Sequence, residues 1–192
     1  AVTSGERNTA VGWKALEDAT GSSNTALGEQ ALFNNTTASD NTAVGTGSLA
    51  NTTTGALNTA VGKASLLANT TGTSNVSLGA NSLQANTTGA QNVALGRNAL
   101  LVNTTASNNT AVGNAALIAN TTGAENVALG SYTMSSNTTG VYNTGLGRLA
   151  LRYNTTGTNN TAVGWSALEA NTTGTYNTAN GWEALKNNTT AS

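Results

Sequence analysis

The sequence is one short motif repeated along its whole length. The unit reads N-T-A-V-G-x-x-A-L-x-x-N-T-T-G-x-x, and its first asparagine recurs every 17 residues except for one initial spacing of 16. Repeats of this kind form extended arrays in which each unit packs mainly against its neighbours. We number the positions of the unit 1 to 17, and the eleven units begin at Asn8, Asn24, Asn41, Asn58, Asn75, Asn92, Asn109, Asn126, Asn143, Asn160 and Asn177.

The repeats define one array over residues 1–192. Residues 1–7 form a partial repeat, and residues 8–192 hold eleven repeats, of which the first is one residue short and the last is incomplete. The missing residue lies in the stretch Glu17-Asp18-Ala19-Thr20. The sequence opens in mid-repeat without Met and neither end has an obvious cap, so we expect a segment of something longer.

Constancy differs sharply between positions of the unit. Position 1 is Asn and position 5 is Gly in all eleven units, position 4 is Val or Leu in ten, and position 9 is Leu in ten. Positions 3 and 8 are always small. All charged and all aromatic residues fall at positions 6, 7, 10, 11, 16 or 17. Sites that accept Trp, Lys or Gly alike are not packed core sites, so these six positions are predicted to point outward.

This pattern predicts an all-β fold, a parallel β-solenoid or β-roll with one coil of about 17 residues per repeat, because helical-pair repeats need about 33 residues. Positions 1–4 read as a strand in which positions 2 and 4 share a face, and we expect both to point inward. A second strand would carry positions 8 and 9. Glycines at positions 5 and 15 would supply turn geometries. Coils about 4.8 Å apart would give a rod on the order of 50 Å long.

Stacked coils place identical residues above one another. We predict that the position 1 asparagines form an internal ladder of side-chain amides, the alternative being that Asn is only a favourable turn residue. Two sizeable apolar side chains per coil make a small core, which favours assembly with other chains. The alanine rows at positions 3 and 8 would then provide a subunit interface, unless they simply fill a narrow core.

Composition excludes several classes of function. The formal net charge is −1, which does not suit a nucleic-acid binder, and the chain has no His and no Cys. No apolar run approaches the roughly 20 residues of a membrane span. The acidic side chains lie on outward positions of mostly separate coils. We therefore predict no catalytic residues, no metal site and no cofactor, and we expect that the protein is not an enzyme.

The units at 160–174 (NTAVGWSALEANTTG) and 177–190 (NTANGWEALKNNTT) resemble the repeats of phage tail-fibre and bacterial surface-fibre proteins. More distantly, the repeat is similar to the head repeats of trimeric autotransporter adhesins, which form a left-handed parallel β-roll of three adjacent chains. The resemblance covers nearly the whole chain. It implies a rigid spacer or adhesin shaft in an extracellular, cell-surface or virion fibre, assembled from copies of itself as a homotrimer or filament.

Three tryptophans are candidate contact residues. Trp13, Trp165 and Trp182 all occupy position 6, and the last two lie in adjacent coils, where we expect them to stack. Exposed aromatic strips often contact carbohydrate or protein, so a cell-surface glycan or protein is the predicted partner. Packing between subunits is the alternative.

Asparagines supply the remaining candidates. Asn180 replaces Val or Leu at position 4. Facing a three-fold axis, three copies of Asn180 would form a polar layer that binds an anion or water and sets the register; the alternative is a polar residue tolerated near the end of the array. Position 12 carries sequons, and their asparagines would be glycan acceptors in an organism that glycosylates them, although the repeat alone accounts for them. They include Asn69, Asn86, Asn120, Asn154 and Asn171.

The alternative function is a binding module with a regular surface, such as an ice-binding or carbohydrate-binding solenoid. Ice-binding faces usually present Thr-x-Thr, which places two threonines on one face of a strand. Here the threonines of N-T-T-G, such as Thr70 and Thr71, are adjacent and would point in opposite directions. Only one outward rank of threonines remains, which weakens the ice-binding hypothesis.

Overall fold

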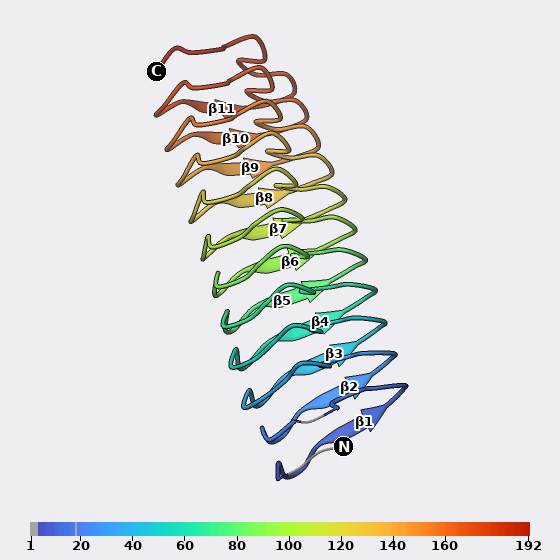
Figure 1. Ribbon diagram of the computed structural model, residues 1–192. Coiled ribbons are helices and arrows are strands. Elements are labelled where there is room, and N and C mark those ends of the chain that lie inside the picture. The colour runs from blue at the N-terminus through green and yellow to red at the C-terminus, as the bar shows by residue number, and fades with distance from the viewer. Residues whose placement is uncertain (1–3, 18) are drawn as a thin grey trace.

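The computed structural model describes residues 4–17 and 19–192, and within them the chain forms strands and turns without any helix. Eleven three-residue strands pair in parallel, in chain order, to make a single sheet (Figure 1). The predicted parallel β-solenoid with one coil per repeat is confirmed. The strands are β1 (Thr9–Val11), β2 (Thr25–Leu27), β3 (Thr42–Val44), β4 (Thr59–Val61), β5 (Val76–Leu78), β6 (Val93–Leu95), β7 (Thr110–Val112), β8 (Val127–Leu129), β9 (Thr144–Leu146), β10 (Thr161–Val163) and β11 (Thr178–Asn180).

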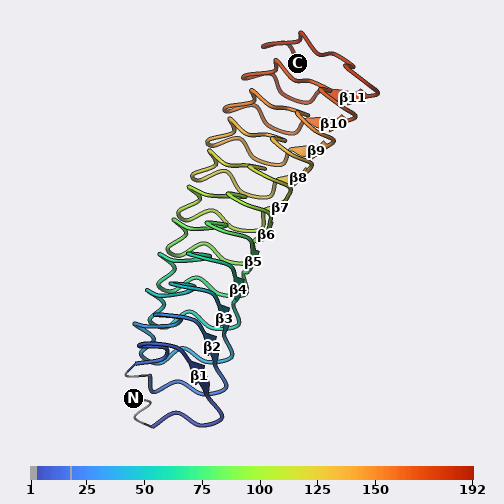
Figure 2. The same ribbon diagram turned by 90° about the vertical axis from the view of Figure 1, so that its right-hand side faces the viewer.

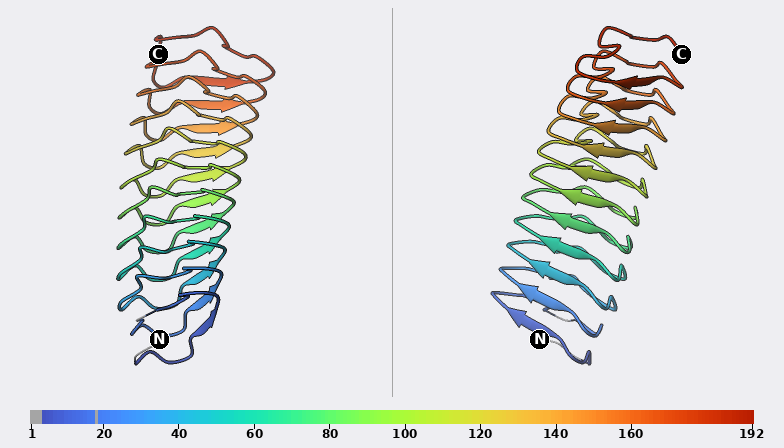
Figure 3. Two further views of the ribbon diagram at one scale, coloured as in Figure 1. Left: turned by 45° about the vertical axis from the view of Figure 1, so that its right-hand side comes forward. Right: turned by 180° about the vertical axis from the view of Figure 1, so that it is seen from behind.

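The coils stack into a rod whose two ends are the two ends of the chain, as the side view in Figure 2 shows. All strands lie along one side of the rod (Figure 3). Each residue pairs with its equivalent one repeat away, as Thr42 does with Thr59 and Val44 with Val61. After each strand the chain turns and runs back along the opposite side of the coil. We call positions 9–13 of each repeat the return segment.

The interior of each coil is narrow, and its filling differs from the sequence prediction. In β3, for example, Ala43 at position 3 is fully buried, whereas Thr42 and Val44 are partly exposed. The prediction that positions 2 and 4 point inward is therefore wrong. Leu49 in the return segment is also fully buried, and with one large side chain entering from that side only a small side chain fits beneath the strand.

The alanine rows fill a narrow core, as the alternative to a subunit interface predicted. Residues at position 3 from Ala26 onward and most residues at position 8 are buried within a single chain, so they cannot contact a second chain. The prediction that such a row forms a subunit interface is wrong. A Cβ at these positions fills the space between the strand and the leucine row, and this is why larger residues are absent there.

The predicted second strand does not form. Positions 7 and 9 adopt left-handed backbone conformations, such as φ of 54° at Ala64 and 52° at Leu66, so the chain turns there instead of extending. Gly62 at position 5 has a φ of 129°, as expected for a glycine corner. The glycine at position 15 has a different reason. At Gly72 an added Cβ would collide with Oδ1 of Asn69 and with the carbonyl oxygen of Gly89 in the next coil. Other coils nevertheless hold a buried alanine at this position, as at Ala38 and Ala106.

The position 1 asparagine ladder is confirmed, and it is more extensive than expected. The backbone N–H of Asn58 donates to Oδ1 of Asn41 at 2.9 Å, and its Nδ2 donates to the carbonyl of Gly72 at 2.9 Å. The same backbone bond joins each of these asparagines to its predecessor. The ladder satisfies buried polar groups along the whole array, which turn preference alone would not require.

A second asparagine ladder runs along position 12. Nδ2 of Asn86 donates to Oδ1 of Asn69 at 2.9 Å and to the carbonyl of Gly89 at 2.9 Å. Equivalent bonds continue through the coils that follow. The two ladders together line the end of the coil where the chain passes to the next repeat, and they hold successive coils in register.

Candidate interaction surfaces

The outer face of the sheet is formed by positions 2 and 4 of each repeat, which point away from the core. Position 4 presents an aliphatic row in which Val11 is 56% and Leu78 is 52% exposed. Position 2 presents a row of threonine and valine, all β-branched and therefore suited to strands. The two rows run the full length of the rod. They comprise Thr9, Thr25, Thr42, Thr59, Val76, Val93, Thr110, Val127, Thr144, Thr161 and Thr178, and Val11, Leu27, Val44, Val61, Leu78, Leu95, Val112, Leu129, Leu146 and Val163.

Asn180 lies on this same outer face, at the end of the aliphatic row, and it is exposed. Within one chain it is therefore not a buried polar group in need of a partner. The polar layer of three Asn180 copies at an axis stays a prediction. In the single chain, Asn180 ends the apolar row after Val163.

The three tryptophans lie on the surface but in different surroundings. Trp165 and Trp182 stack as expected, with ring centroids 5.5 Å apart and planes at 11°. Trp13 is far from them along the rod, in the first coil, and the amine of Lys14 lies 5.1 Å from its ring centroid. Only the C-terminal pair therefore forms an aromatic strip.

Charged side chains gather beside that strip, around Glu169. Nη1 of Arg152 lies 3.6 Å from one carboxylate oxygen of Glu169, and Nζ of Lys186 lies 3.9 Å from the other. Lys186 also donates a hydrogen bond to Glu183, and its amine lies 5.4 Å from the ring centroid of Trp165. The bond to Glu183 raises the pKa of Lys186, so this cation stays charged at neutral pH.

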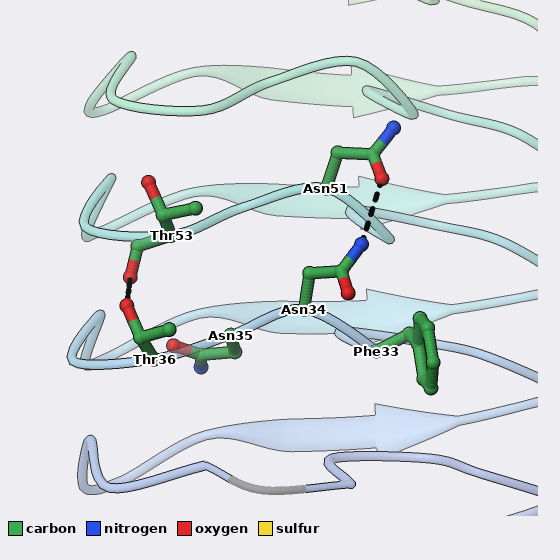
Figure 4. A pocket seen from close by; sticks show the side chains of 6 residues that line it. All are labelled: Phe33, Asn34, Asn35, Thr36, Asn51 and Thr53. Carbon is green, nitrogen blue, oxygen red and sulfur yellow. Dashed lines mark hydrogen bonds between the residues drawn. The ribbon is translucent and has the colours of Figure 1, made fainter.

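Two of the cavities in the described part of the chain open on the return segments. The larger, of about 480 Å³, is lined by Phe33, Asn34, Asn35, Thr36, Asn51 and Thr53. Figure 4 shows these residues in front of the strands, on the opposite side of the coil. Two of the polar side chains lining it already have partners: Asn34 donates to Asn51 at 2.9 Å, and Thr36 donates to the carbonyl of Thr53 at 2.9 Å. The smaller cavity, of about 290 Å³, lies at the Glu169 cluster.

The sequon asparagines are inside the coil. Asn69, Asn86, Asn120, Asn154 and Asn171 are fully buried, and their Nδ2 atoms donate within the second ladder. A glycan is attached through that nitrogen, and the folded coil has no space for one. The proposed glycan acceptors are therefore core residues in the folded array.

Among the described residues, no three acidic, His or Cys side chains lie close enough together to hold a metal ion. The part of the chain that the structure describes also has no helix long and apolar enough to cross a bilayer.

Sequence reasoning missed the outer face and the Glu169 cluster. The sequence did contain a signal for the outer face, since position 3 is always small whereas position 4 accepts Val, Leu and Asn. The Glu169 cluster is formed by side chains from three coils at positions 10 and 11. These positions vary between repeats, so the repeat pattern does not predict which of their side chains lie close together. Comparison with known proteins identifies no family, because no family model, curated protein or solved structure matches the chain.

Proposed function

We propose that the chain is a structural segment of an extracellular or virion fibre, and that it assembles with copies of itself through the outer face of the sheet. The observation that supports this most directly is the double row of threonine, valine and leucine along the rod. On this proposal the protein is a rigid shaft and not an enzyme. Three chains per rod is the arrangement that the resemblance to β-roll adhesins favours.

The chemistry of the outer face suits another protein. None of its residues is charged, because every charged side chain falls at other positions of the repeat. Charge depletion distinguishes the centre of a protein interface from ordinary surface. A continuous apolar face of this length would also be an aggregation hazard if it stayed open to water.

Size and periodicity favour a second copy as the partner. Eleven strands about 4.8 Å apart, with a face about 10 Å wide, present roughly 500 Å² per chain. Two such faces would bury on the order of 1,000 Å², about the minimum area of a biological interface. A copy of this chain matches the spacing of the rows at every coil.

Light scattering after size exclusion, with negative-stain imaging, would test the proposal. The unmodified chain is expected to form rods of several chains, with three favoured. Leu78→Glu combined with Leu95→Glu should give monomers, because two adjacent coils then present carboxylates to the partner. Thr88→Glu combined with Thr105→Glu is the matched control, since both threonines are exposed at position 14 of the corresponding coils.

Circular dichroism would establish that both double variants keep their fold. A monomeric unmodified protein would contradict the proposal. So would a Leu78/Leu95 variant that assembles as well as the control.

Ice binding is the second candidate, because the outer face carries Thr-x-Val or Thr-x-Leu in regular strands. This differs from the N-T-T-G threonines, of which only one rank is outward: the Thr70 hydroxyl donates to the carbonyl of Thr87, while Thr71 is exposed. Valines at position 2 and the mixture of Val and Leu at position 4 make the face uneven, which favours a protein partner. A thermal hysteresis assay without activity would eliminate ice binding.

A further inference from the structure

The smaller cavity lies on the return segments of the C-terminal coils. It has a volume of about 290 Å³ and is lined by Tyr153, Glu169, Ala170, Lys186 and Asn187. These residues occupy positions 10 and 11 of three successive coils. Return segments run on the side of the rod opposite the strands, so the cavity stays open when the outer face of the sheet is covered.

The carboxylate of Glu169 lines this cavity without a hydrogen-bond donor among the described residues. Its side chain is only 13% exposed. The nearest cations, at 3.6 Å and 3.9 Å, balance its charge but lie beyond hydrogen-bonding distance. A polar contact beyond 3.5 Å is commonly bridged from the side by water, and a ligand hydroxyl can take the place of that water. A partly buried carboxylate in this state would accept hydrogen bonds from a ligand.

The remaining lining supplies complementary contacts. Tyr153 is substantially exposed, and one face of its ring is covered by the guanidinium of Arg152, 4.8 Å from the centroid. The other face can pack against an apolar surface. Lys186 has donors beyond the one given to Glu183, and the side chain of Asn187 is exposed and offers both a donor and an acceptor.

We propose that this cavity binds a single neutral pyranose ring of a glycan. Neighbouring hydroxyls would donate to the two oxygens of Glu169, Lys186 and Asn187 would bond further hydroxyls, and the ring would pack against Tyr153. The volume accommodates one sugar ring. Two cations, Arg152 and Lys186, are balanced by Glu169 and Glu183, so the site carries no net charge that would select an anion.

The larger cavity does not share these properties. Its amide and hydroxyl groups at Asn34 and Thr36 are already bonded to the neighbouring coil, and its lining contains no charged residue. The unpartnered Oδ1 of Asn35 is buried and therefore not accessible from the cavity. The sugar site is also independent of the proposed fibre assembly, because its residues lie outside positions 2 and 4. Each proposal can therefore fail without the other.

Saturation-transfer difference NMR on the full chain would test the site. The probes are methyl α-D-glucopyranoside, methyl α-D-mannopyranoside and methyl β-D-galactopyranoside, with N-acetylneuraminic acid as the anionic comparison. At least one neutral pyranoside should receive saturation. Glu169→Gln should weaken its binding by about tenfold, because charge-assisted hydrogen bonds become neutral ones, and Tyr153→Ala should weaken it similarly.

Matched controls are Glu125→Gln and Tyr176→Ala, which alter exposed residues away from the cavity and should bind as the unmodified chain does. Light scattering should give all four variants the mass of the unmodified protein. The proposal is overturned if none of the neutral pyranosides binds, if only N-acetylneuraminic acid binds, or if Glu169→Gln and Tyr153→Ala both retain full binding.

Discussion

At the scale of single residues, the core around the coil that contains β9 departs from the repeat at three residues whose changes in size compensate for one another. Position 3 is glycine there, and a Cβ on Gly145 would lie 2.7 Å from Cγ2 of Thr133 and 3.0 Å from Cε of Met134. Those two residues replace the usual alanine or serine and leucine of positions 8 and 9 in the preceding coil. Gly145 therefore provides space for larger neighbours, and no unusual φ is involved.

Gly145→Ala is predicted to destabilise the protein by about 1–2 kcal/mol through overpacking. Adding Thr133→Ala should recover part of that loss, because it removes the closer contact and gives the pair found at Ala99 and Ala111, while Cε of Met134 stays near. A double-mutant cycle measured by urea unfolding would give the coupling. Without the clash, replacing glycine by alanine would instead stabilise the protein by about 0.4–1 kcal/mol, because it restricts the unfolded chain. The sign of the change in unfolding free energy therefore shows whether the clash is present.

At the scale of elements, the second ladder has one interruption. Thr52 stands where most coils have asparagine, and both its hydroxyl and Oδ1 of Asn35 are buried without a hydrogen-bond partner. Thr52→Asn would place an amide between Asn35 and Asn69. It is predicted to stabilise the protein by about 1–2 kcal/mol, since two buried groups would then be satisfied.

The reverse exchange, Asn103→Thr, breaks the ladder in mid-array and should destabilise by about 1–3 kcal/mol. Urea unfolding of both variants would measure these opposite effects. A neutral Thr52→Asn beside a destabilising Asn103→Thr would contradict the assignment of Oδ1 of Asn35 as a buried acceptor without a donor.

Part of the arrangement of these elements was predictable from the sequence. Repeat length and the fixed asparagine at position 1 were sufficient to predict the parallel solenoid and the first ladder. The face of each strand that points inward was predicted wrongly, because both faces are apolar or small and alternation alone fits either orientation. The sequence left open whether the asparagine at position 12 is a glycan acceptor, since Asn-Thr-Thr is the same whether its asparagine points inward or outward. The cavity at Glu169 depends on side-chain positions across three coils, which the repeat pattern does not specify.

At the scale of the whole molecule, the array should behave as a stack of interchangeable units. Each strand contacts only the strands before and after it. Removing one complete coil therefore joins surfaces that already match. Deletion of residues 92–108 connects Gln91 to Asn109, which preserves the order of position 17 followed by position 1.

This 17-residue deletion is predicted to keep the fold and to shorten the rod by one coil, about 4.8 Å. Deletion of residues 92–107 instead leaves Asn108 as an extra residue between two ladder positions. It should destabilise the protein by roughly 2–4 kcal/mol, because buried amides of both ladders lose alignment at that coil. Small-angle scattering would compare lengths and urea unfolding would compare stabilities. Equal stability of the two deletions would mean that the ladders do not set the register of the rod, since the two differ only in whether a full repeat is removed.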